Sequence, residues 1–275
     1  MDIPVFRPNM NKAKILKELE KIFDTGWIGL GPKTEEFGSK FAFYHRTKYG
    51  IALNSATAAL HLALVASGIK KGDEVLVPSM TFVSTALVAL YEDAIPVFVD
   101  VEPDTLCMDI KDLEKKITKK SKVIIPVHFG GHACKMDELM NLARKNNLIV
   151  IEDCAHATGA KYKNKPLGSF GLMGCFSFHA VKNLTTGDGG MIITDDEKIN
   201  NKLRKLRWVG IDRDTWSRTG IKYSWRYTVD ELGYKYHMND ITAVIGLVQL
   251  ETVEQDNKKR RNLAQRYQKK LEDYL

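Results

Sequence analysis

The sequence predicts an α/β protein with a mostly parallel central sheet flanked by helices. Short apolar segments alternate with helical patterns along most of the chain. Several of the apolar segments are continuous, which is typical of strands that are buried on both faces. With 275 residues, 44% of them hydrophobic and 27% charged, the chain is long enough for one large globular domain with a substantial core.

The elements follow in order from these patterns. The expected strands, all short and apolar, are residues 50–53, 74–77, 96–99, 122–127, 148–152, 174–178 and 191–194. Apolar residues at helical spacing predict helices over residues 57–66, 84–91 and 136–146. The final stretch, 243–275, has the pattern of one long and increasingly charged helix. No repeat, low-complexity tract or obvious linker interrupts this order.

The charge pattern argues against nucleic acid as a partner. The net charge is +7, a modest excess that also suits an acidic small molecule. The basic cluster at 258–261 lies in the expected last helix near Asp256 and Glu251, so a solvated helix face explains it. We find no zinc-finger spacing, aromatic-rich RNA motif or basic tail. We therefore expect no nucleic-acid partner.

The cysteines and the first residues bear on location. The four cysteines are widely spaced without a C-x-x-C pair, which predicts free thiols and no structural metal site. The first residues lack the basic and apolar segments of a signal peptide, and no apolar run reaches membrane-spanning length. We expect a cytoplasmic protein without a membrane partner.

In open α/β sheets, ligands gather at the carboxyl ends of the strands, and two early segments place suitable residues there. After the strand that ends at Leu53, small residues including Ala56 and Thr57 open a helix, where backbone N–H groups attract a phosphate. Small residues also cap helices for structural reasons alone. Phe82 follows the next strand and can stack on a flat ring, although an isolated phenylalanine is more commonly a core residue.

The third segment is a buried apolar strand that runs into Glu152 and Asp153. Carboxylates are costly to bury unless they are paired. Asp153 is suited to pair with a protonated pyridine nitrogen, as pyridoxal phosphate requires, and His156 lies within reach of the phenolic oxygen of that ring. A hydrogen-bonded structural histidine is the alternative for His156.

The fourth segment places Lys182 just past the strand that ends at Phe178, and a glycine-rich turn follows. A lysine is usually exposed, but a desolvated amine at this position is a nucleophile for the aldehyde of pyridoxal phosphate. Ser177 is well placed for a phosphate oxygen. His179, beside the strand end, is a candidate for substrate contact, and a structural role is the alternative for it. The simplest interpretation of Asp188, in the turn after Lys182, is a structural role that stabilises this turn.

The motifs taken together closely resemble the sugar-nucleotide aminotransferases of the DegT/DnrJ/EryC1/StrS family, over nearly the whole chain. The segments that carry the resemblance are residues 26–37, 57–64, 81–86, 96–101, 152–156, 177–182 and 233–241.

This resemblance implies an aspartate-aminotransferase-like fold (fold type I) and a homodimer with shared active sites. Lys182 would bind the cofactor aldehyde, Asp153 would pair with the ring nitrogen, and Phe82 would stack on the ring. Residues Ala56, Thr57 and Ser177 would hold the phosphate. Lys235 would reach the cofactor phosphate of the partner subunit.

The sequence departs from the family pattern in three places. Lys235 stands where many members have asparagine, and Asp188 where many have glutamate. Family members continue into a small C-terminal domain after a helix like this chain's last one. The expected division is therefore a cofactor-binding large domain over residues 1–245 and a long helix over residues 246–275, with the small domain absent.

The expected function is transfer of an amino group from an amino acid, glutamate, to a ketosugar linked to a nucleoside diphosphate, with pyridoxamine phosphate as intermediate. A related sugar dehydratase is the enzymatic alternative, but such enzymes typically have histidine in place of Lys182. A non-catalytic binding or regulatory protein is the other alternative. The sequence leaves open the sugar, the nucleotide and the carbon that is aminated.

Overall fold

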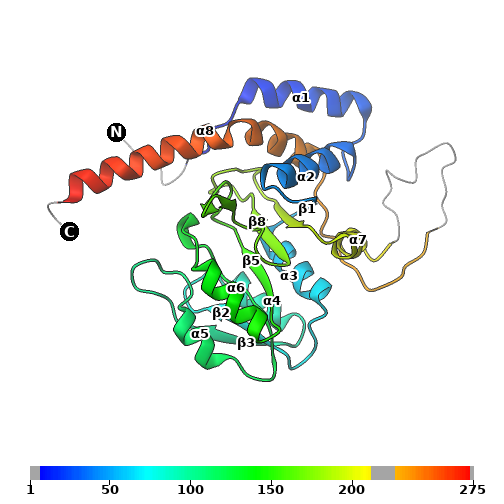
Figure 1. Ribbon diagram of the computed structural model, residues 1–275. Helices are drawn as coiled ribbons and strands as arrows, with labels where there is room; N and C mark the ends of the chain where they lie inside the picture. The colour runs from blue at the N-terminus through cyan, green and yellow to red at the C-terminus, as the bar shows by residue number, and fades with distance from the viewer. Residues whose placement is uncertain (1–6, 212–226, 273–275) are drawn as a thin grey trace.

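The fold is described from a computed structural model that covers residues 7–211 and 227–272 (Figure 1). The helices are α1 (Lys12–Thr25), α2 (Pro32–Tyr44), α3 (Ala56–Ser67), α4 (Ser84–Leu90), α5 (Ile110–Lys116), the 3-10 helix η1 (Phe129–Gly131), α6 (Met136–Lys145), α7 (Glu197–Leu206) and α8 (Asp240–Leu271). The strands are β1 (Tyr49–Leu53), β2 (Glu74–Pro78), β3 (Ile95–Val99), β4 (Ser121–Ile124), β5 (Ile149–Asp153), β6 (Lys161–Tyr162), β7 (Lys165–Pro166), β8 (Met173–Ser177) and β9 (Gly190–Thr194).

A seven-stranded sheet in the order β1-β9-β8-β5-β4-β2-β3 forms the centre of the described part of the chain. Strand β9 runs antiparallel to both of its neighbours, and the other neighbouring pairs are parallel. The prediction of a mostly parallel α/β sheet with flanking helices is therefore confirmed. Because β1, β2, β5 and β8 point the same way, their carboxyl ends meet at one edge of the sheet.

Helices cover the sheet on two faces, and alternate strand residues point into two separate cores. One core joins α2, α5, α6 and α8 to the sheet, and Leu76 and Val150 belong to it. The other core joins α3, α4 and α7 to the opposite face, and Val75 and Ile151 belong to it. Burial on both faces explains why these strands are continuously apolar in the sequence.

The observed elements agree with the predicted ones in most of their bounds. The strand expected over 122–127 is shorter, because regular pairing in β4 ends at Ile124. The long last helix begins at Asp240 rather than at 243. The sequence patterns did not reveal α1, α2, α5, α7 or the small β6–β7 hairpin. No helix in the two described ranges is long and apolar enough to cross a lipid bilayer.

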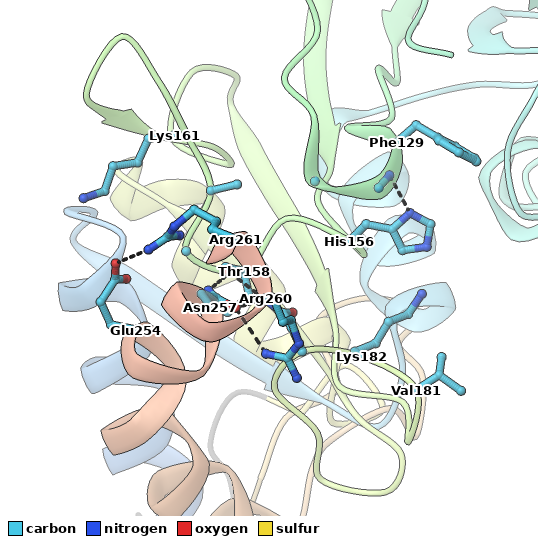
Figure 2. Close-up of a pocket in the computed structure, with 15 residues that line it drawn as sticks. Phe129, His156, Thr158, Lys161, Val181, Lys182, Glu254, Asn257, Arg260 and Arg261 are labelled. Carbon is cyan, nitrogen blue, oxygen red and sulfur yellow. Dashed lines mark hydrogen bonds and ion pairs between the residues drawn. The ribbon is translucent and has the colours of Figure 1, made fainter. Parts of the chain in front are cut away.

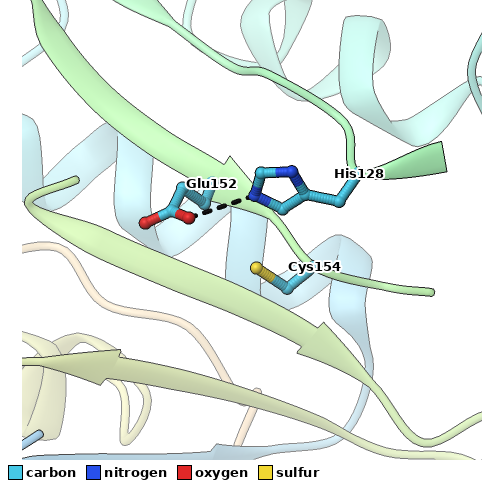
Figure 3. Close-up of side chains that lie close together, drawn as sticks. All are labelled: His128, Glu152 and Cys154. Atoms are coloured by element: carbon cyan, nitrogen blue, oxygen red, sulfur yellow. Dashed lines mark hydrogen bonds and ion pairs between the residues drawn. The ribbon is translucent and has the colours of Figure 1, made fainter. Parts of the chain in front are cut away.

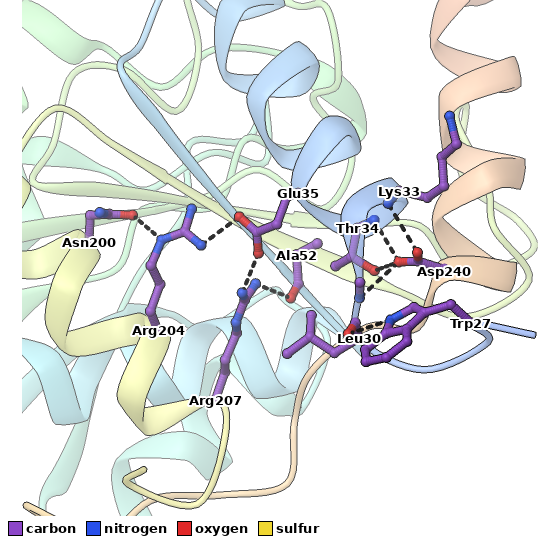
Figure 4. Close-up of polar contacts among 11 residues, drawn as sticks. Trp27, Leu30, Lys33, Thr34, Glu35, Ala52, Asn200, Arg204, Arg207 and Asp240 are labelled. Carbon is purple, nitrogen blue, oxygen red and sulfur yellow. Dashed lines mark hydrogen bonds and ion pairs between the residues drawn. The ribbon is translucent and has the colours of Figure 1, made fainter. Parts of the chain in front are cut away.

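A buried carboxylate joins the first residues of α2 and α8 (Figure 4). Asp240 is fully buried and accepts hydrogen bonds from the N–H groups of Gly31, Lys33 and Thr34 and from the Thr34 hydroxyl, at 2.7–3.1 Å. These donors lie at the start of α2, where a helix has no internal acceptors for its own N–H groups. Asp240 therefore fixes the start of the 32-residue helix α8 against α2.

Candidate active site

A cavity of about 390 Å³ opens at the sheet edge where β1, β2, β5 and β8 end. The predicted site residues that line it are Ala56, Thr57, Phe82, Asp153, His156, Ser177, His179 and Lys182. The segments that carry them are far apart in the sequence and are brought together because the parallel strands end at the same edge.

Lys182 lies on the loop between β8 and β9, and backbone hydrogen bonds hold this loop. The N–H of Phe178 donates to the carbonyl of Gly189 at 2.8 Å, and the N–H of Lys182 donates to the carbonyl of His179 at 2.9 Å. Gly187 has a φ of 88°, which a residue with a side chain rarely adopts. Burial lowers the pKa of Lys182, which Asp153 partly opposes. The amine is therefore more readily deprotonated than an exposed lysine.

Asp153 ends strand β5 and is buried, with one hydrogen-bond donor on each carboxylate oxygen. The N–H of Ala155 donates to Oδ1 at 3.0 Å, and the hydroxyl of Thr85 donates to Oδ2 at 2.9 Å. Burial raises the pKa of Asp153, and these two hydrogen bonds act in the opposite direction. A cationic group in the cavity is the partner that this carboxylate requires.

His156 presents one ring nitrogen for a further partner. The N–H of Gly130 donates to its Nδ1 at 3.3 Å, so in the neutral ring Nε2 carries the proton. Burial, and then the positive charge of Lys182, lowers the pKa of His156. A neutral His156 is therefore a hydrogen-bond donor through Nε2, as contact with a phenolic oxygen requires.

The opposite end of the cavity suits an anion. Ser55 caps α3 by accepting a hydrogen bond from the N–H of Ala58 at 3.0 Å. The N–H groups of Ala56 and Thr57 lie in the first turn and therefore have no acceptor within the helix. Ser177 accepts a weak hydrogen bond from the N–H of His179 at 3.4 Å, so its own hydroxyl hydrogen is available to donate. Helix dipole and donors together favour a phosphate at this end.

Phe82 lies at the cavity as predicted, whereas Lys235 lies away from the cavity of its own chain. Phe82 lines the cavity but is 73% exposed, so the phenylalanine is not a core residue. Lys235 does not line the cavity of its own chain. Its Nζ lies 3.2 Å from the centre of the Trp208 ring, in a cation–π contact.

Glu152, next to Asp153 on β5, has a structural role (Figure 3). Its carboxylate is fully buried and accepts from the N–H groups of Gly168, Phe170 and Gly171 at 2.7–2.8 Å and from Nε2 of His128 at 3.0 Å. Polar atoms of His128, Glu152 and Cys154 lie within 4.8 Å of one another. Because hydrogen bonds already occupy both oxygens of Glu152, this network explains the cluster without a metal ion.

A second, open cavity of about 750 Å³ adjoins the first (Figure 2). The two cavities share Phe129, His156, Val181 and Lys182 as a common wall. The far side of the second cavity carries three cationic side chains and one carboxylate. These are Lys161, Arg260, Arg261 and Glu254.

Three site residues were not anticipated from the sequence. The hydroxyl of Thr85 donates to Asp153. The hydroxyl oxygens of Ser84 and Thr57 lie 2.7 Å apart. Asn183 joins the Lys182 loop to the carbonyl of Thr158 at 2.8 Å and to Asn257 of α8 at 3.0 Å. Ser84 and Thr85 closely follow Phe82 in the sequence. Their position beside a predicted stacking ring could have marked them as site residues.

The sequence profile of the DegT/DnrJ/EryC1/StrS aminotransferase family matches residues 9–275. The chain belongs to this family. The aminotransferase chain is 45% identical over 274 residues to the uncharacterized protein MJ1066 of Methanocaldococcus jannaschii, covering 98% of this chain and 70% of that one. It is 42% identical over 266 residues to the spore coat polysaccharide biosynthesis protein SpsC of Bacillus subtilis, covering 97% and 68%.

The fold of this aminotransferase also matches solved structures. The putative sugar aminotransferase Spr1654 of Streptococcus pneumoniae in its PMP form superposes with a TM-score of 0.92 at 35% identity, covering 98% of this chain and 72% of that one. The same protein is known in a PLP form, with a TM-score of 0.91. The expected fold, that of the sugar aminotransferases, is confirmed.

Proposed function

We propose that this chain is a pyridoxal-phosphate-dependent aminotransferase that acts on a nucleotide-linked ketosugar with glutamate as amino donor, in amino-sugar and polysaccharide biosynthesis. The observation that carries the proposal is one cavity that combines the amine of Lys182, the buried carboxylate of Asp153 and the amino end of α3. Four buried free cysteines suit a cytoplasmic location.

The residues of the cavity fit the cofactor at each of its functional groups. The cavity of about 390 Å³ is within the roughly 300–1,000 Å³ that is usual for small-molecule sites. Lys182 offers an amine, Asp153 a buried anion for the ring nitrogen, and Ala56, Thr57 and Ser177 donors for the phosphate. When bound, pyridoxal phosphate supplies an aldehyde that accepts the amino group and a ring that takes up electrons.

Four residues of the cavity would each have a separate role in the proposed reaction. Nζ of Lys182, whose pKa burial lowers, would be the nucleophile for the cofactor aldehyde and the group that carries a proton from the α-carbon of the amino donor to the cofactor. Asp153 would hold a proton on the ring nitrogen by its negative charge. His156 would donate from Nε2 to the phenolic oxygen, and Phe82 would stack on the ring.

We place the acceptor substrate in the adjoining cavity. Its lining includes Lys182 but none of the expected phosphate-binding residues, and its cationic side chains suit a diphosphate. His179 lines the cofactor cavity and is exposed, as contact with a substrate requires. An Arg260→Ala variant is expected to raise KM for the sugar nucleotide without a comparable change in KM for glutamate.

We further propose a homodimer in which the partner subunit covers the rim of the cofactor cavity. Met80, Phe82 and Val83 are 43%, 73% and 56% exposed beside that rim, which is unusual for neighbouring large apolar side chains. Lys235 would then leave Trp208 and approach the cofactor phosphate of the partner. Sedimentation equilibrium tests this arrangement, and a monomer at micromolar concentration would contradict it.

The deciding experiment is borohydride reduction of the purified chain with pyridoxal phosphate, followed by peptide mass mapping. We expect one pyridoxyl group on Lys182, none in Lys182→Ala, and an unchanged adduct in Lys161→Ala, which alters a lysine of the adjoining cavity. Adducts scattered over surface lysines would refute the site.

A second assay separates the aminotransferase from its alternatives. Incubation of the loaded protein with glutamate should release 2-oxoglutarate and leave pyridoxamine phosphate. Cofactor binding without this half-reaction would indicate a binding protein, and activity that depends on added pyridoxamine phosphate alone would indicate a dehydratase.

A further inference from the structure

Two threonines on either side of Phe82 form a chain of hydroxyl groups that ends on Asp153. Oγ1 of Thr81 lies 2.8 Å from Oγ1 of Thr85, which lies 2.9 Å from Oδ2 of Asp153. Thr85 is in the first turn of α4, and both threonines line the cofactor cavity. The segment that carries the stacking ring is thus tied to the carboxylate at the end of β5.

The chemistry of the three groups fixes the direction of the hydrogen bonds. An ionised carboxylate only accepts, so Thr85 must donate its single hydroxyl hydrogen to Asp153. The Thr85 oxygen then accepts, and Thr81 is its donor. With the N–H of Ala155 on Oδ1, each oxygen of Asp153 has one donor from the described part of the chain.

Burial makes the Thr85 hydroxyl important for the charge of Asp153. Thr85 is fully buried and Asp153 is 4% exposed. Desolvation favours the neutral acid and raises the pKa of Asp153, whereas the donors from Ala155 and Thr85 favour the anion. A donor that is itself polarised by a second hydroxyl is a stronger donor.

We propose that Thr85, supported by Thr81, is a positioning residue that keeps Asp153 ionised and oriented toward the ring nitrogen of the cofactor. The role toward the cofactor rests on the proposed function, whereas the role toward Asp153 does not. The backbone of Thr85 also holds the turn after Phe82, since the N–H of Thr85 donates to the Phe82 carbonyl at 3.1 Å.

The first test uses the cofactor-free protein. The carboxyl carbon of Asp153 is followed by 13C NMR across pH in protein labelled at aspartate, with Asp153→Asn to assign the signal. We expect Thr85→Val to move the Asp153 titration to higher pH and Thr85→Ser, which keeps the hydroxyl, to leave it in place. Equal titrations in Thr85→Val and the unaltered protein would overturn the proposal.

Thr81→Val provides a second variant that leaves Thr85 itself intact. It should shift the Asp153 titration in the same direction but by less, because only the support of Thr85 is lost. If one of the two variants failed to fold, the other would still test the hydroxyl chain, and an unshifted Asp153 titration in every variant that folds would exclude a role for it.

The second test uses protein loaded with pyridoxal phosphate labelled with 15N in the ring. The nitrogen signal should be that of a protonated ring in the unaltered protein and in Thr85→Ser, and should move toward the unprotonated position in Thr85→Val. Cofactor affinity should fall about tenfold in Thr85→Val. A protonated signal in all variants would overturn the role toward the cofactor.

The two tests distinguish failure of the proposed function from failure of the role proposed for Thr85. If the unaltered protein bound no pyridoxal phosphate, the proposed function would fall, while the Asp153 titration would still decide whether Thr85 controls that carboxylate. A defect of packing alone would lower the thermal stability of Thr85→Val without moving either NMR signal.

Discussion

The negative charge of Asp153 acts on Lys182 across the candidate active site. Burial lowers the pKa of Lys182, and the negative charge of Asp153 opposes this effect. An Asp153→Asn substitution removes that charge, so the ammonium form loses a stabilising partner and the pKa of Lys182 should fall further. Competitive acetylation of the cofactor-free protein across pH, read by peptide mapping, measures this change.

Asp188→Asn is the matched control for this prediction. Asp188 also lines the cavity but is exposed to solvent, which screens its charge. Its substitution should shift the acetylation profile of Lys182 less than Asp153→Asn does. A profile that both substitutions leave unmoved would argue against electrostatic coupling in this cavity.

Phe82 is expected to contribute to cofactor binding and little to folding, because its ring is 73% exposed. Phe82→Ala should weaken pyridoxal phosphate binding by roughly three- to tenfold, the value of an aromatic stacking contact. The melting temperature of the cofactor-free protein should stay unchanged. Fluorescence titration and calorimetry measure the two quantities, and Phe129→Ala, at the wall that the two cavities share, offers a comparison that retains the stacking ring.

At the scale of single residues, chemistry could be predicted where the residue type is rare at its place in the sequence. Lysine after an apolar strand and aspartate at the end of one are such cases, and Lys182 and Asp153 do line one cavity. Thr85 and Ser84 escaped prediction because threonine and serine are common, and only the fold brings Thr85 to Asp153 over 68 positions.

Among the elements, the junction of α2 and α8 depends on one carboxylate. Asp240→Ala would leave the buried N–H groups of Gly31 and Thr34, and the half-buried N–H of Lys33, without this acceptor. We expect a loss of about 3 kcal/mol in the free energy of unfolding. Urea denaturation measures the loss.

Asp196 caps α7 in the ordinary way and serves as the comparison. It accepts one hydrogen bond at the start of the helix, from the N–H of Ile199 at 3.0 Å, and is exposed. Asp196→Ala should therefore cost about 1 kcal/mol. Equal losses in the two variants would show that Asp240 acts as a simple helix cap.

The sequence predicted strands better than their directions. Continuous apolar runs located β2, β5 and β8 closely, because burial on both faces leaves that pattern. The reversed direction of β9 follows from its antiparallel pairing with β1 and β8. Local sequence patterns could not predict it, because they do not show which strands pair. The helix α2 escaped prediction because its residues mix apolar, charged and glycine positions.

For the molecule as a whole, buried His45 should make stability depend on pH. Its Nδ1 lies 3.0 Å from the Phe41 carbonyl, and burial lowers its pKa to about 4. The unfolded chain binds a proton near pH 6.5, whereas the folded protein does not until about pH 4. Stability contributed by neutral His45 is thus complete above pH 6.5 and is lost as the pH falls toward 4.

The expected loss from this residue is about 1.4 kcal/mol for each pH unit within that window. Urea unfolding at pH 7 and pH 5 should show a smaller difference for His45→Gln, which cannot titrate, than for the unaltered protein. His132→Gln, a change at an exposed histidine, should keep the full difference. Identical pH dependence in His45→Gln and the unaltered protein would contradict the assignment.

Glu152 and Asp153 are neighbours on one strand whose side chains face opposite ways, one toward the 168–171 backbone and one toward the cavity. In a deep mutational scan scored by growth that requires the proposed activity, both positions would tolerate almost no replacement and would look alike. A scan scored by the cellular amount of folded protein would separate them: variants at 152 would be depleted, and variants at 153 would accumulate as intact but inactive protein.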